Sequence, residues 1–509
     1  MIEEERKFGA DDAFRLPDLT DRLPAGGGMV KAPPATLTAT YYDTPDLRLA
    51  RAGVSLRHRK GDSLPWTVKL PAAVPGLRHE VSRKGRAGNP PADLVALVTA
   101  WSRGAALAPA AKIQTVRHAY DLTDAEGTVL AEVADDAVTV FDGKAVRMAF
   151  REIEVERKAG DRALLGAVAA VLVDAGAVEG EFTPKHVRAL GGAAALPPDL
   201  VPPGDLPDQP SAGDVVVAAV RSGVGRILAH DPLVRLGQPL DDGDTAVHQM
   251  RVGCRRLRSD LRTFAALLDR AWVDRIRDEL RWIAGVLGDA RDAEVLRERL
   301  QHTANADPLC PVDAAAIARL DEALDARQRQ ALADVDEALR SARYHALLDL
   351  LVDAAREPQV APTATQPALR LLPRMVAKPW RRLAYGAKGV DGAADLDPLA
   401  ADERWHAVRI NGKRARYAVD AVASVIGGPA AKLAKALGKV QNLLGEHQDA
   451  AVAADTWVSL AEDSPGDTGL AVVAGRLYER ERASIRAVRA AFPEAWAVAA
   501  EPTRTRWLP

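Results

Sequence analysis

Residues 151–158 read REIEVERK, and this octapeptide predicts the fold of the N-terminal part of the chain. Successive side chains of a strand point to opposite faces, so Ile153 and Val155 share one face and three glutamates share the other. We expect the apolar face to pack outward against helices, which turns the carboxylates into a barrel. Like-charged carboxylates are costly to bury unless cations neutralise them. These glutamates are Glu152, Glu154 and Glu156.

The N-terminus repeats this alternation of charged side chains. It reads MIEEERKF, so Glu3, Glu5 and Lys7 point to one face of a strand. Carboxylate oxygens are hard ligands of the kind that Mg²⁺ or Mn²⁺ prefers. The two acidic strands together predict a site for one of these cations. An ordinary solvated strand is the alternative, and it accounts for EEERK alone because Glu4 and Arg6 make both faces polar.

Further segments, among them SLRHR, WTVKL and TVRHAYDL, supply cations at similar positions. A cavity with an acidic and a basic sector suits a metal-bridged polyanion, because Lys and Arg hold phosphate oxygens while carboxylates hold the metal. Phosphoryl transfer needs mainly such positioning and charge neutralisation. The basic residues are Arg57, Arg59, Lys69, Arg83, Arg117, Lys185 and Arg188.

The chain divides into a strand-rich part, a linker and a helical part. Residues 2–160 read as eight or nine short strands, with helices over 90–102 and 161–176, and this spacing favours a closed or nearly closed barrel. Residues 191–214 contain six prolines, which predicts a semi-rigid linker; an ordered loop packed on the barrel is the alternative. From residue 215 onward, strand signals almost vanish and the periodicity predicts about ten helices.

The helical part contains an internal repeat. HQMRVGCRRLR at 248–258 matches HAVRINGKRAR at 406–416, and LGDARDAEV at 287–295 matches LGEHQDAAV at 444–452. The two pairs recur at offsets of 158 and 157 residues. The repeat predicts two related helical bundles packed about a pseudo-twofold axis.

Each copy of the first motif places a cationic stripe on a helix. The first stripe holds His248, Arg251, Arg255, Arg258 and Arg262, and the second holds His406, Arg409, Lys413 and Arg416. Aligned cations on two facing helices repel each other unless a polyanion lies between them. A solvated basic face paired with nearby Asp and Glu is the alternative. Nucleic acid is a weaker candidate ligand, because aromatic residues are not interleaved with the cations.

The bulk composition is that of a soluble globular protein. The 509 residues have a formal net charge of -2, which argues neither for nor against an anionic ligand. Two unrelated cysteines, the absence of a signal peptide and the absence of a run of eighteen apolar residues predict a cytoplasmic protein without a membrane span.

The motifs of the first part resemble the CYTH family of triphosphate tunnel metalloenzymes. The resemblance rests on E-x-E-x-K at the N-terminus, YYDTPDLRLARAGVSLRHRKG, WTVKLP and EIEVE. It implies an eight-stranded antiparallel tunnel, bound Mg²⁺ or Mn²⁺, and one of three activities: inorganic triphosphatase, thiamine triphosphatase or class IV adenylate cyclase.

The same resemblance assigns roles to residues of this chain. The metal-binding and catalytic carboxylates would be Glu3, Glu5, Glu132, Asp136, Glu152 and Glu154. The triphosphate-binding residues would be Lys7, Arg57, Arg59, Lys69, Arg117 and Lys185, to which Arg83 is added from its place in RHEVSRKG. The resemblance leaves open whether Asp135 or Asp136 faces inward, and it gives Glu80 no role.

The repeated H-x-x-R-x-x-x-(R/K)-R-x-R pattern, with LGDARD and LGEHQD, resembles the CHAD domain. This resemblance implies a helical domain that binds inorganic polyphosphate and often follows a CYTH domain. The groove would be lined by His248, Arg251, Arg255, Arg256, His406, Arg409, Lys413 and Arg414. Arg374, Lys378 and Arg381 would extend it, and Tyr417 would pack or hydrogen-bond beside them.

We therefore expect an α+β multidomain protein, with an eight-stranded tunnel over 1–190, a Pro-rich linker over 191–212 and an all-helical domain over 213–509. The preferred hypothesis is metal-dependent hydrolysis of inorganic tripolyphosphate to pyrophosphate and phosphate, with polyphosphate bound by the helical domain. A non-catalytic polyphosphate-binding protein, an adenylate cyclase and a thiamine triphosphatase are the alternatives.

Overall fold

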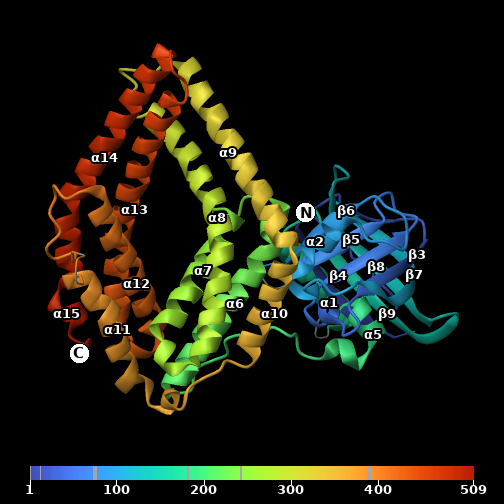
Figure 1. Ribbon diagram of the computed structural model, residues 1–509. Helices are drawn as coiled ribbons and strands as arrows, with labels where there is room; N and C mark the ends of the chain where they lie inside the picture. Colours follow the sequence, from blue (N-terminus) through green and yellow to red (C-terminus); the bar gives the residue numbers. More distant parts are fainter. Residues whose placement is uncertain are drawn as a thin grey trace. The chain divides into compact units, whose positions relative to one another are not determined.

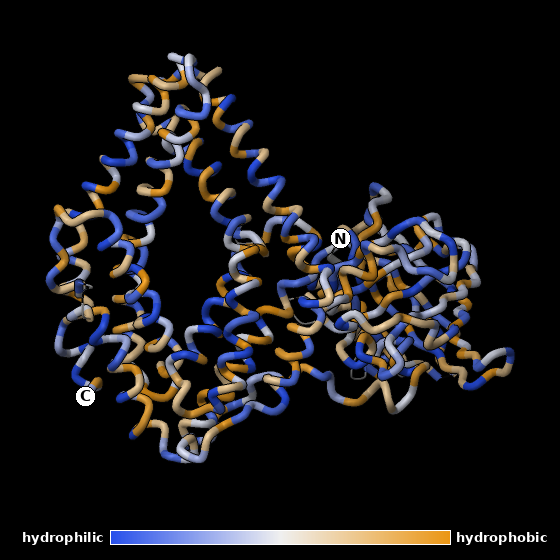
Figure 2. The backbone as a smooth tube through the Cα atoms, in the orientation of Figure 1, coloured by the Kyte–Doolittle hydropathy of each residue, from blue (hydrophilic) through white to orange (hydrophobic). Residues whose placement is uncertain are grey.

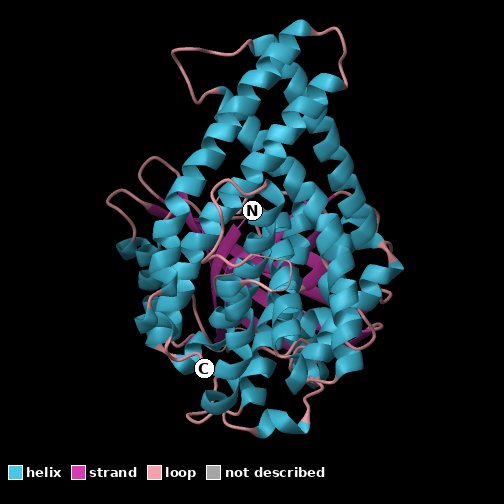
Figure 3. Ribbon diagram, turned by 60° about the vertical axis from the view of Figure 1, so that its left-hand side comes forward, coloured by secondary structure: helices cyan, strands magenta, loops and turns pink. Residues whose placement is uncertain are grey.

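The computed structural model describes residues 2–11, 13–72, 77–179, 183–240, 243–387, 389 and 391–509, except for the side chains of Ile2 and Glu3. The chain forms two compact units, residues 1–199 and 200–509. The strands described, β1 to β10, belong to the first unit, and the long helices α6 to α14 belong to the second (Figure 3). The boundary between the units falls inside the segment that we interpret as a linker.

The first unit is built on a closed antiparallel barrel of eight strands (Figure 1). The strands follow the order β1-β6-β5-β4-β3-β7-β8-β9, and β9 pairs with β1 to close the ring, while β10 adds to β1 and β2 to β7. This confirms the expected fold. The strands are β1 Ile2–Ala10, β2 Gly28–Lys31, β3 Ala35–Asp43, β4 Ser55–Lys60, β5 Trp66–Pro71, β6 Leu77–Arg83, β7 Ala108–Thr123, β8 Val129–Asp142, β9 Ala145–Arg157 and β10 Val178–Glu179.

The alternation in REIEVERK produces the expected two-sided strand. Ile153 and Val155 of β9 are fully buried on the outer face of the barrel, in one cluster with Val168 and Leu172 of α4. Burying an aliphatic side chain of this size stabilises the fold by about 1.5–3 kcal/mol. The apolar face therefore holds α4 (Arg162–Asp174) against the barrel, and the glutamates between these residues face the other way.

Four short helices complete the first unit: α1 Arg48–Arg51, α2 Ala92–Leu97, α3 Thr99–Ser102 and α5 Lys185–Leu190. The start of the predicted linker is ordered and packs on them. Asp199 lies 2.7 Å from Arg51 Nη2 and 2.6 Å from Arg103 Nη2, and Arg51 also donates to the carbonyl of Pro197. Pro197 and Asp199 of the predicted linker thus bond to the helical part of the first unit.

The second unit consists of ten α-helices among the described residues. They are α6 Ala212–Leu236, α7 Ala246–Thr263, α8 Arg270–Ala304, α9 Ala314–Arg340, α10 Ala342–Arg356, α11 Ala368–Tyr385, α12 Asp402–Ile426, α13 Gly428–Glu462, α14 Thr468–Ala500 and α15 Pro502–Thr505. Figure 2 shows hydrophilic and hydrophobic residues alternating along these helices, as expected for helices that pack on one side. No helix within the described ranges is both long enough and apolar enough to cross a membrane.

The internal repeat is visible in the helix boundaries of the second unit. Helices α8 and α13 each have 35 residues, and they begin and end 158 residues apart. Each is preceded by a motif helix, α7 or α12, and followed by a long antiparallel neighbour, α9 or α14 (Figure 1). The motif helices α7 and α12 contact each other. The two halves thus place their cationic stripes on neighbouring helices.

Candidate functional site

A cavity of about 300 Å³ lies inside the barrel. Its walls come from β1, from β3 to β9 and from the start of α5, so charged side chains from distant parts of the sequence share one enclosed space. Nine residues that the sequence places in the site line this cavity: Glu5, Lys7, Arg57, Arg59, Lys69, Arg117, Glu132, Glu154 and Lys185.

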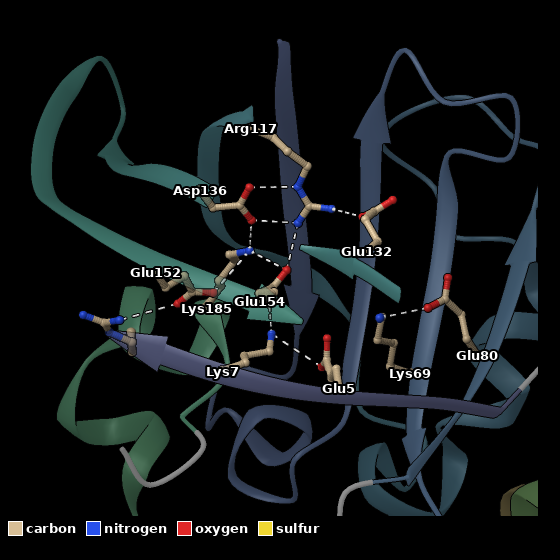
Figure 4. Close-up of polar contacts among 11 residues, drawn as sticks. Glu5, Lys7, Lys69, Glu80, Arg117, Glu132, Asp136, Glu152, Glu154 and Lys185 are labelled. Atoms are coloured by element: carbon tan, nitrogen blue, oxygen red, sulfur yellow. Dashed lines mark hydrogen bonds and ion pairs between the residues drawn. The ribbon is translucent and has the colours of Figure 1, made fainter. Parts of the chain in front are cut away.

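Glu154 is the carboxylate on which three cations converge (Figure 4). Arg117 Nη2 lies 2.8 Å and Lys185 Nζ 3.1 Å from Glu154 Oε2, and Lys7 pairs with Oε1. Burial raises the pKa of a carboxyl group, but the charges of Lys185, Lys7 and Arg117 hold the pKa of Glu154 well below its usual range. Burial likewise opposes the charge of Lys7, yet the carboxylates Glu154, Glu5 and Glu152 raise its pKa. Glu154 is therefore ionised and keeps three cations at the cavity.

Two expected carboxylates, Asp136 and Glu152, are buried and do not line the cavity. Arg117 binds both oxygens of Asp136, at 2.8 and 2.7 Å. Lys185 pairs with Asp136 and lies 3.2 Å from Glu152 Oε1. Burial raises the pKa of Glu152, and the charge of Lys185 opposes that shift. In this structure the two residues orient Arg117 and Lys185, whose charged ends reach the cavity.

A row of three glutamates crosses β1, β9 and β8. Glu5 lies directly opposite Glu156, and Glu156 lies directly opposite Glu132. All three line the cavity. Like charges directly opposite each other in a sheet are destabilising. Each member has one cation at ion-pair distance: Lys158 Nζ is 2.6 Å from Glu156, Lys7 Nζ is 3.5 Å from Glu5, and Arg117 Nη1 is 3.7 Å from Glu132.

This glutamate row fits a divalent cation by the chemistry of its donors. Glu5, Glu132 and Glu156 supply hard carboxylate oxygens, and a bound cation would relieve their mutual repulsion. Among the described residues no three His, Cys, Asp or Glu side chains already converge on one point, and the side chain of Glu3 lies outside the described residues. Glu5, Glu132, Glu156 and Glu154 are thus the described residues that would hold a metal.

The opposite wall of the cavity is basic and comes from β4, β5 and β6. It holds Arg57, Arg59, Lys69 and Arg78. Burial opposes the charge of Arg57, but the Tyr41 hydroxyl and the carboxylates of Glu80 and Glu154 raise its pKa. The Nε atom of Arg57 has no hydrogen-bond partner among the described residues. This wall can therefore donate to an anionic ligand.

Arg83 does not belong to the cavity, and that part of our interpretation is wrong about its position. Its guanidinium is half-exposed and pairs with Asp93 at 2.5 Å. Arg78 and Glu80 of the same strand face the cavity, and Arg83 is an odd number of residues away from both. Side chains at odd spacing point to opposite faces of a strand. Arg83 therefore faces outward.

The structure also settles which aspartate of β8 faces inward. Asp136 bonds to Arg117, whereas Asp135 bonds to Arg151 at 2.8 and 2.7 Å. Asp136 is completely buried, so it lies between the barrel wall and Lys185 rather than free in the cavity.

Seven lining residues have no role in our sequence-based assignments: Tyr41, Ser55, Arg78, Glu80, Glu156, Pro184 and His186. Strand alternation accounts for three of them. Glu156 lies two residues from Glu154 on β9, and Arg78 and Glu80 lie two residues apart on β6. Lys69 Nζ lies 2.9 Å from Glu80. His186 carries no such signal, because it lies on α5 and reaches the cavity through packing: its ring stacks on Tyr41 at 5.1 Å. Burial, with the charges of Arg78 and Lys7, lowers the pKa of His186 to about 3, so its imidazole is neutral.

The second unit contains a pocket of about 380 Å³ between α7, α8 and α12, which we call the basic pocket. Its charged residues are all cationic: Arg255, Arg258, Arg262, Arg277, Arg281, Lys413 and Arg414. Burial, with the charges of Arg409, Arg255 and Arg251, lowers the pKa of Lys413 to about 7. Cations that repel one another in this way favour an anionic ligand. Tyr417 also lines the pocket, as expected.

The other expected groove residues lie outside the basic pocket. Arg251 lies 3.4 Å from Asp292, and Arg409 lies 3.9 Å from Asp449. These aspartates belong to LGDARD and LGEHQD, so each second motif supplies a carboxylate to the first motif of its own half. The second motif also supplies Gln448, whose side-chain amide oxygen contacts Nδ1 of His406.

Two further expected residues have local partners. His248 Nε2 lies 3.8 Å from Asp244. Arg256 does not line the basic pocket, and its charge acts on Asp260 and Asp420 instead. Arg381, expected to extend the groove, bonds to the carbonyl of Pro509, whereas Arg374 and Lys378 do line a neighbouring pocket.

A closed eight-stranded barrel around a charged cavity, joined to two related helical bundles, defines a two-domain class of protein, and comparisons with known proteins agree. Residues 1–187 match the CYTH domain and residues 218–458 match the CHAD domain. Uncharacterized protein Rv2226 of Mycobacterium tuberculosis is 33% identical over 508 residues, which covers 94% of this chain and 93% of that protein. The chain belongs to the family in which a CYTH domain is followed by a CHAD domain.

Two solved structures resemble the chain in part. PptA from Streptomyces chartreusis is 26% identical, with a TM-score of 0.46, and the match covers 56% of this chain and 99% of PptA. The CHAD domain from the plant Ricinus communis is 24% identical, with a TM-score of 0.41, and the match covers 57% of this chain and 97% of that domain.

Proposed function

We propose that the barrel hydrolyses inorganic tripolyphosphate to pyrophosphate and phosphate with the help of Mg²⁺ or Mn²⁺, and that the helical unit binds polyphosphate. One observation carries the first part: the cavity sets the glutamate row against a wall of arginines and lysines. A linear triphosphate carries negative charge along its whole length, so it needs cations from the chain on one side and a metal ion on the other.

In this proposal the basic residues bind the phosphate groups and the glutamates bind the metal. Arg57, Arg59 and Lys69 donate to phosphate oxygens, and Lys7, Arg117 and Lys185 turn from Glu154 toward the phosphate that leaves. The glutamates of the row, with Glu154, hold the divalent cation, which supplies charge neutralisation to the phosphate oxygens when bound. The neutral imidazole of His186 leaves the net charge of the basic wall unchanged.

The proposal is tested by phosphate release from tripolyphosphate with and without each metal. We expect Glu5→Gln to lower metal-dependent turnover by about 10- to 100-fold, because it removes a donor of the row. Glu4→Gln is the matched control: Glu4 is the next residue of β1, and it faces Arg157 and Arg162 at 2.7 and 2.8 Å on the other side. We expect the Glu4 variant to stay within about twofold of the native rate. Equal rates for the native chain and Glu5→Gln would reject the proposal.

The same assay distinguishes the candidate substrates. ATP and thiamine triphosphate, offered in parallel, test the thiamine triphosphatase alternative, and cyclic AMP as a product of ATP would favour the cyclase. Absence of turnover with every substrate and metal would favour the non-catalytic alternative. We expect tripolyphosphate to be the best substrate, because the cations of the cavity, and a metal held by its glutamates, would all bind phosphate oxygens.

The basic pocket carries the second part of the proposal. No carboxylate is among the described lining residues, and of the seven cations only Arg277 and Arg281 have described ion pairs, with Asp274 and Asp278. A polyanion would relieve the repulsion among the other five. Polyphosphate meets this need better than nucleic acid, because Tyr417 is the only aromatic residue described in the lining and offers no series of stacking surfaces.

Polyphosphate binding should depend on pH through Lys413. Its pKa of about 7 in the free chain leaves it partly neutral, and a bound polyanion favours the charged form. Binding above pH 7 therefore takes up a proton, and we expect affinity to fall by up to about tenfold per pH unit between pH 7 and 9. Lys413→Arg keeps the charge at every pH and should flatten this dependence in isothermal titration. Identical pH profiles for the two proteins would contradict the assignment.

A further inference from the structure

The pseudo-twofold repeat gives the α7–α12 pair two related faces with different charges. One face, which we call the arginine face, carries Arg258 and Arg262 of α7 and Arg414 of α12. Adding or subtracting the repeat offset of 158 residues converts these positions to Arg416, Asp420 and Arg256. We call the related set the aspartate face. The two faces therefore differ where an arginine on one corresponds to Asp420 on the other.

The arginine face is a cluster of cations that have no ion pair with a carboxylate of the described residues. Burial, together with the charges of Arg262, Arg382 and Arg258, lowers the pKa of Arg414 to about 10. The face opens on the basic pocket and on a second pocket of about 410 Å³, and no Asp or Glu lines either pocket within the described ranges. The repulsion among these arginines destabilises the protein without ligand, and a bound anion would neutralise it.

The aspartate face compensates its own cations. Asp420 Oδ2 lies 3.7 Å from Arg416 Nε, and although burial raises the pKa of Asp420, the charges of Arg256 and Arg416 act on it in the opposite direction. Asp260 lies beside them, at the position that corresponds to Ala418 in the other half. Burial raises the pKa of Asp260 to about 8, so it adds little negative charge at neutral pH. Asp420 is thus the main carboxylate that offsets Arg256 and Arg416.

The two faces also differ in how far their cations extend. The second pocket continues the arginine face along α11, through Arg374, Lys378 and Arg382. Helix α6 corresponds to α11 in the first half, but two of its arginines bond to other residues of the chain. Arg221 donates to the carbonyl of Ala355 at 2.9 Å, and Arg226 bonds to the side chain of Gln249.

We propose that polyphosphate binds only the arginine face of the helical unit, along α7, α12 and α11, and that Asp420 keeps the related aspartate face from acting as a second site. This inference rests on the proposed binding of polyphosphate. It makes Asp420 a specificity-determining residue. It also predicts that reversing the charge of Asp420 creates a second polyphosphate site, whereas most substitutions at a binding surface only weaken an existing site.

Isothermal titration of the full chain with a short polyphosphate of defined chain length tests the inference. We expect Asp420→Arg, which makes the aspartate face resemble the arginine face, to raise the stoichiometry by one polyphosphate per chain. We expect Arg262→Asp, the reverse exchange, to lower it by one. Polyphosphate bound in the barrel does not affect the difference in stoichiometry, because the cavity is the same in the native chain and in both variants. Asp334→Arg is the matched control, since it makes the same change of charge on an exposed part of α9.

Each outcome separates the inference from the function on which it rests. Unchanged stoichiometry in a folded Asp420→Arg chain would overturn the inference. Asp420→Asn offers the same test with a smaller gain of affinity if the charge reversal prevents folding, which circular dichroism reports. A residual helical site in Arg262→Asp would show that both faces bind, which also overturns it. Equal stoichiometry in the native chain and in Arg262→Asp, without protection of α7 or α12 from hydrogen exchange in either, would instead reject polyphosphate binding by the helical unit.

Discussion

Glu154→Gln should lower kcat for tripolyphosphate by on the order of 10³ while the chain still binds the anion. The substitution removes a charge that contacts Lys7, Arg117 and Lys185, and it removes one of the carboxylates that would hold the metal. The cavity becomes more positive, so the ground-state anion stays bound even though the metal is lost. The expected pattern is therefore a large fall in kcat with a KM that is unchanged or lower.

The measurement combines turnover with thermal unfolding. Removing one partner of a buried ion pair destabilises a protein by about 3–5 kcal/mol, so the variant should melt at a lower temperature without ligand. Tripolyphosphate without metal should recover part of that loss, because the anion neutralises the same three cations. Native-like turnover, or a KM that rises in step with the loss of kcat, would show that Glu154 does not act in this way. Glu4→Gln again serves as the control with an equal change of charge.

Strand alternation is the feature that made the barrel site predictable. The period of two in REIEVERK and EEERK is local, so the inward position of Glu5, Lys7 and Glu154 follows from a few neighbouring residues. The same rule excludes Arg83 from the site, because it lies five residues from Arg78 on β6 and therefore points to the opposite face. Alternation also separates Asp136 from Asp135, because Asp136 lies four residues from the inward-facing Glu132 on β8 and Asp135 lies three.

The glutamate row could not be predicted from local pattern. Glu5, Glu132 and Glu156 lie far apart in the sequence, and they become neighbours only through the register of β1 with β9 and of β9 with β8. Register depends on the pairing of whole strands and on closure of the barrel, for which single-strand periodicity carries no signal. The same limit applies to His186, which α5 brings to Tyr41 by tertiary packing.

In the helical unit, too, some features could be predicted from the sequence and others could not. The i, i+3 and i+7 spacing predicted the stripes on α7 and α12, and the repeat predicted that they would meet. It did not show that Asp292 and Asp449 would engage one end of each stripe. Nor did it show that Arg277 of α8 and Arg382 of α11 would join the other end, since these contacts arise between helices.

Replacing Arg262 and Arg414 with alanine should weaken polyphosphate binding by the helical unit on the order of 10²–10⁴. A hydrogen bond between charged groups contributes about 1.5–3 kcal/mol, and two of them account for that factor. The free chain should be no less stable than the native protein, because each arginine is repelled by the cations around it. A loss of affinity without a loss of melting temperature is the pattern that a binding role predicts and a structural role does not.

The matched control removes two arginines from exposed ion pairs on α9. Arg329 and Arg340 pair with Asp325 and Asp336, so Arg329→Ala with Arg340→Ala changes the net charge equally. Isothermal titration gives the affinity, and hydrogen exchange in α7 and α12 separates this site from the barrel. The affinity of the Arg262 and Arg414 variant should also depend less steeply on salt, because fewer counterions are exchanged on binding. Equal weakening in both double variants would mean that total charge governs polyphosphate binding, and that the arginine face does not.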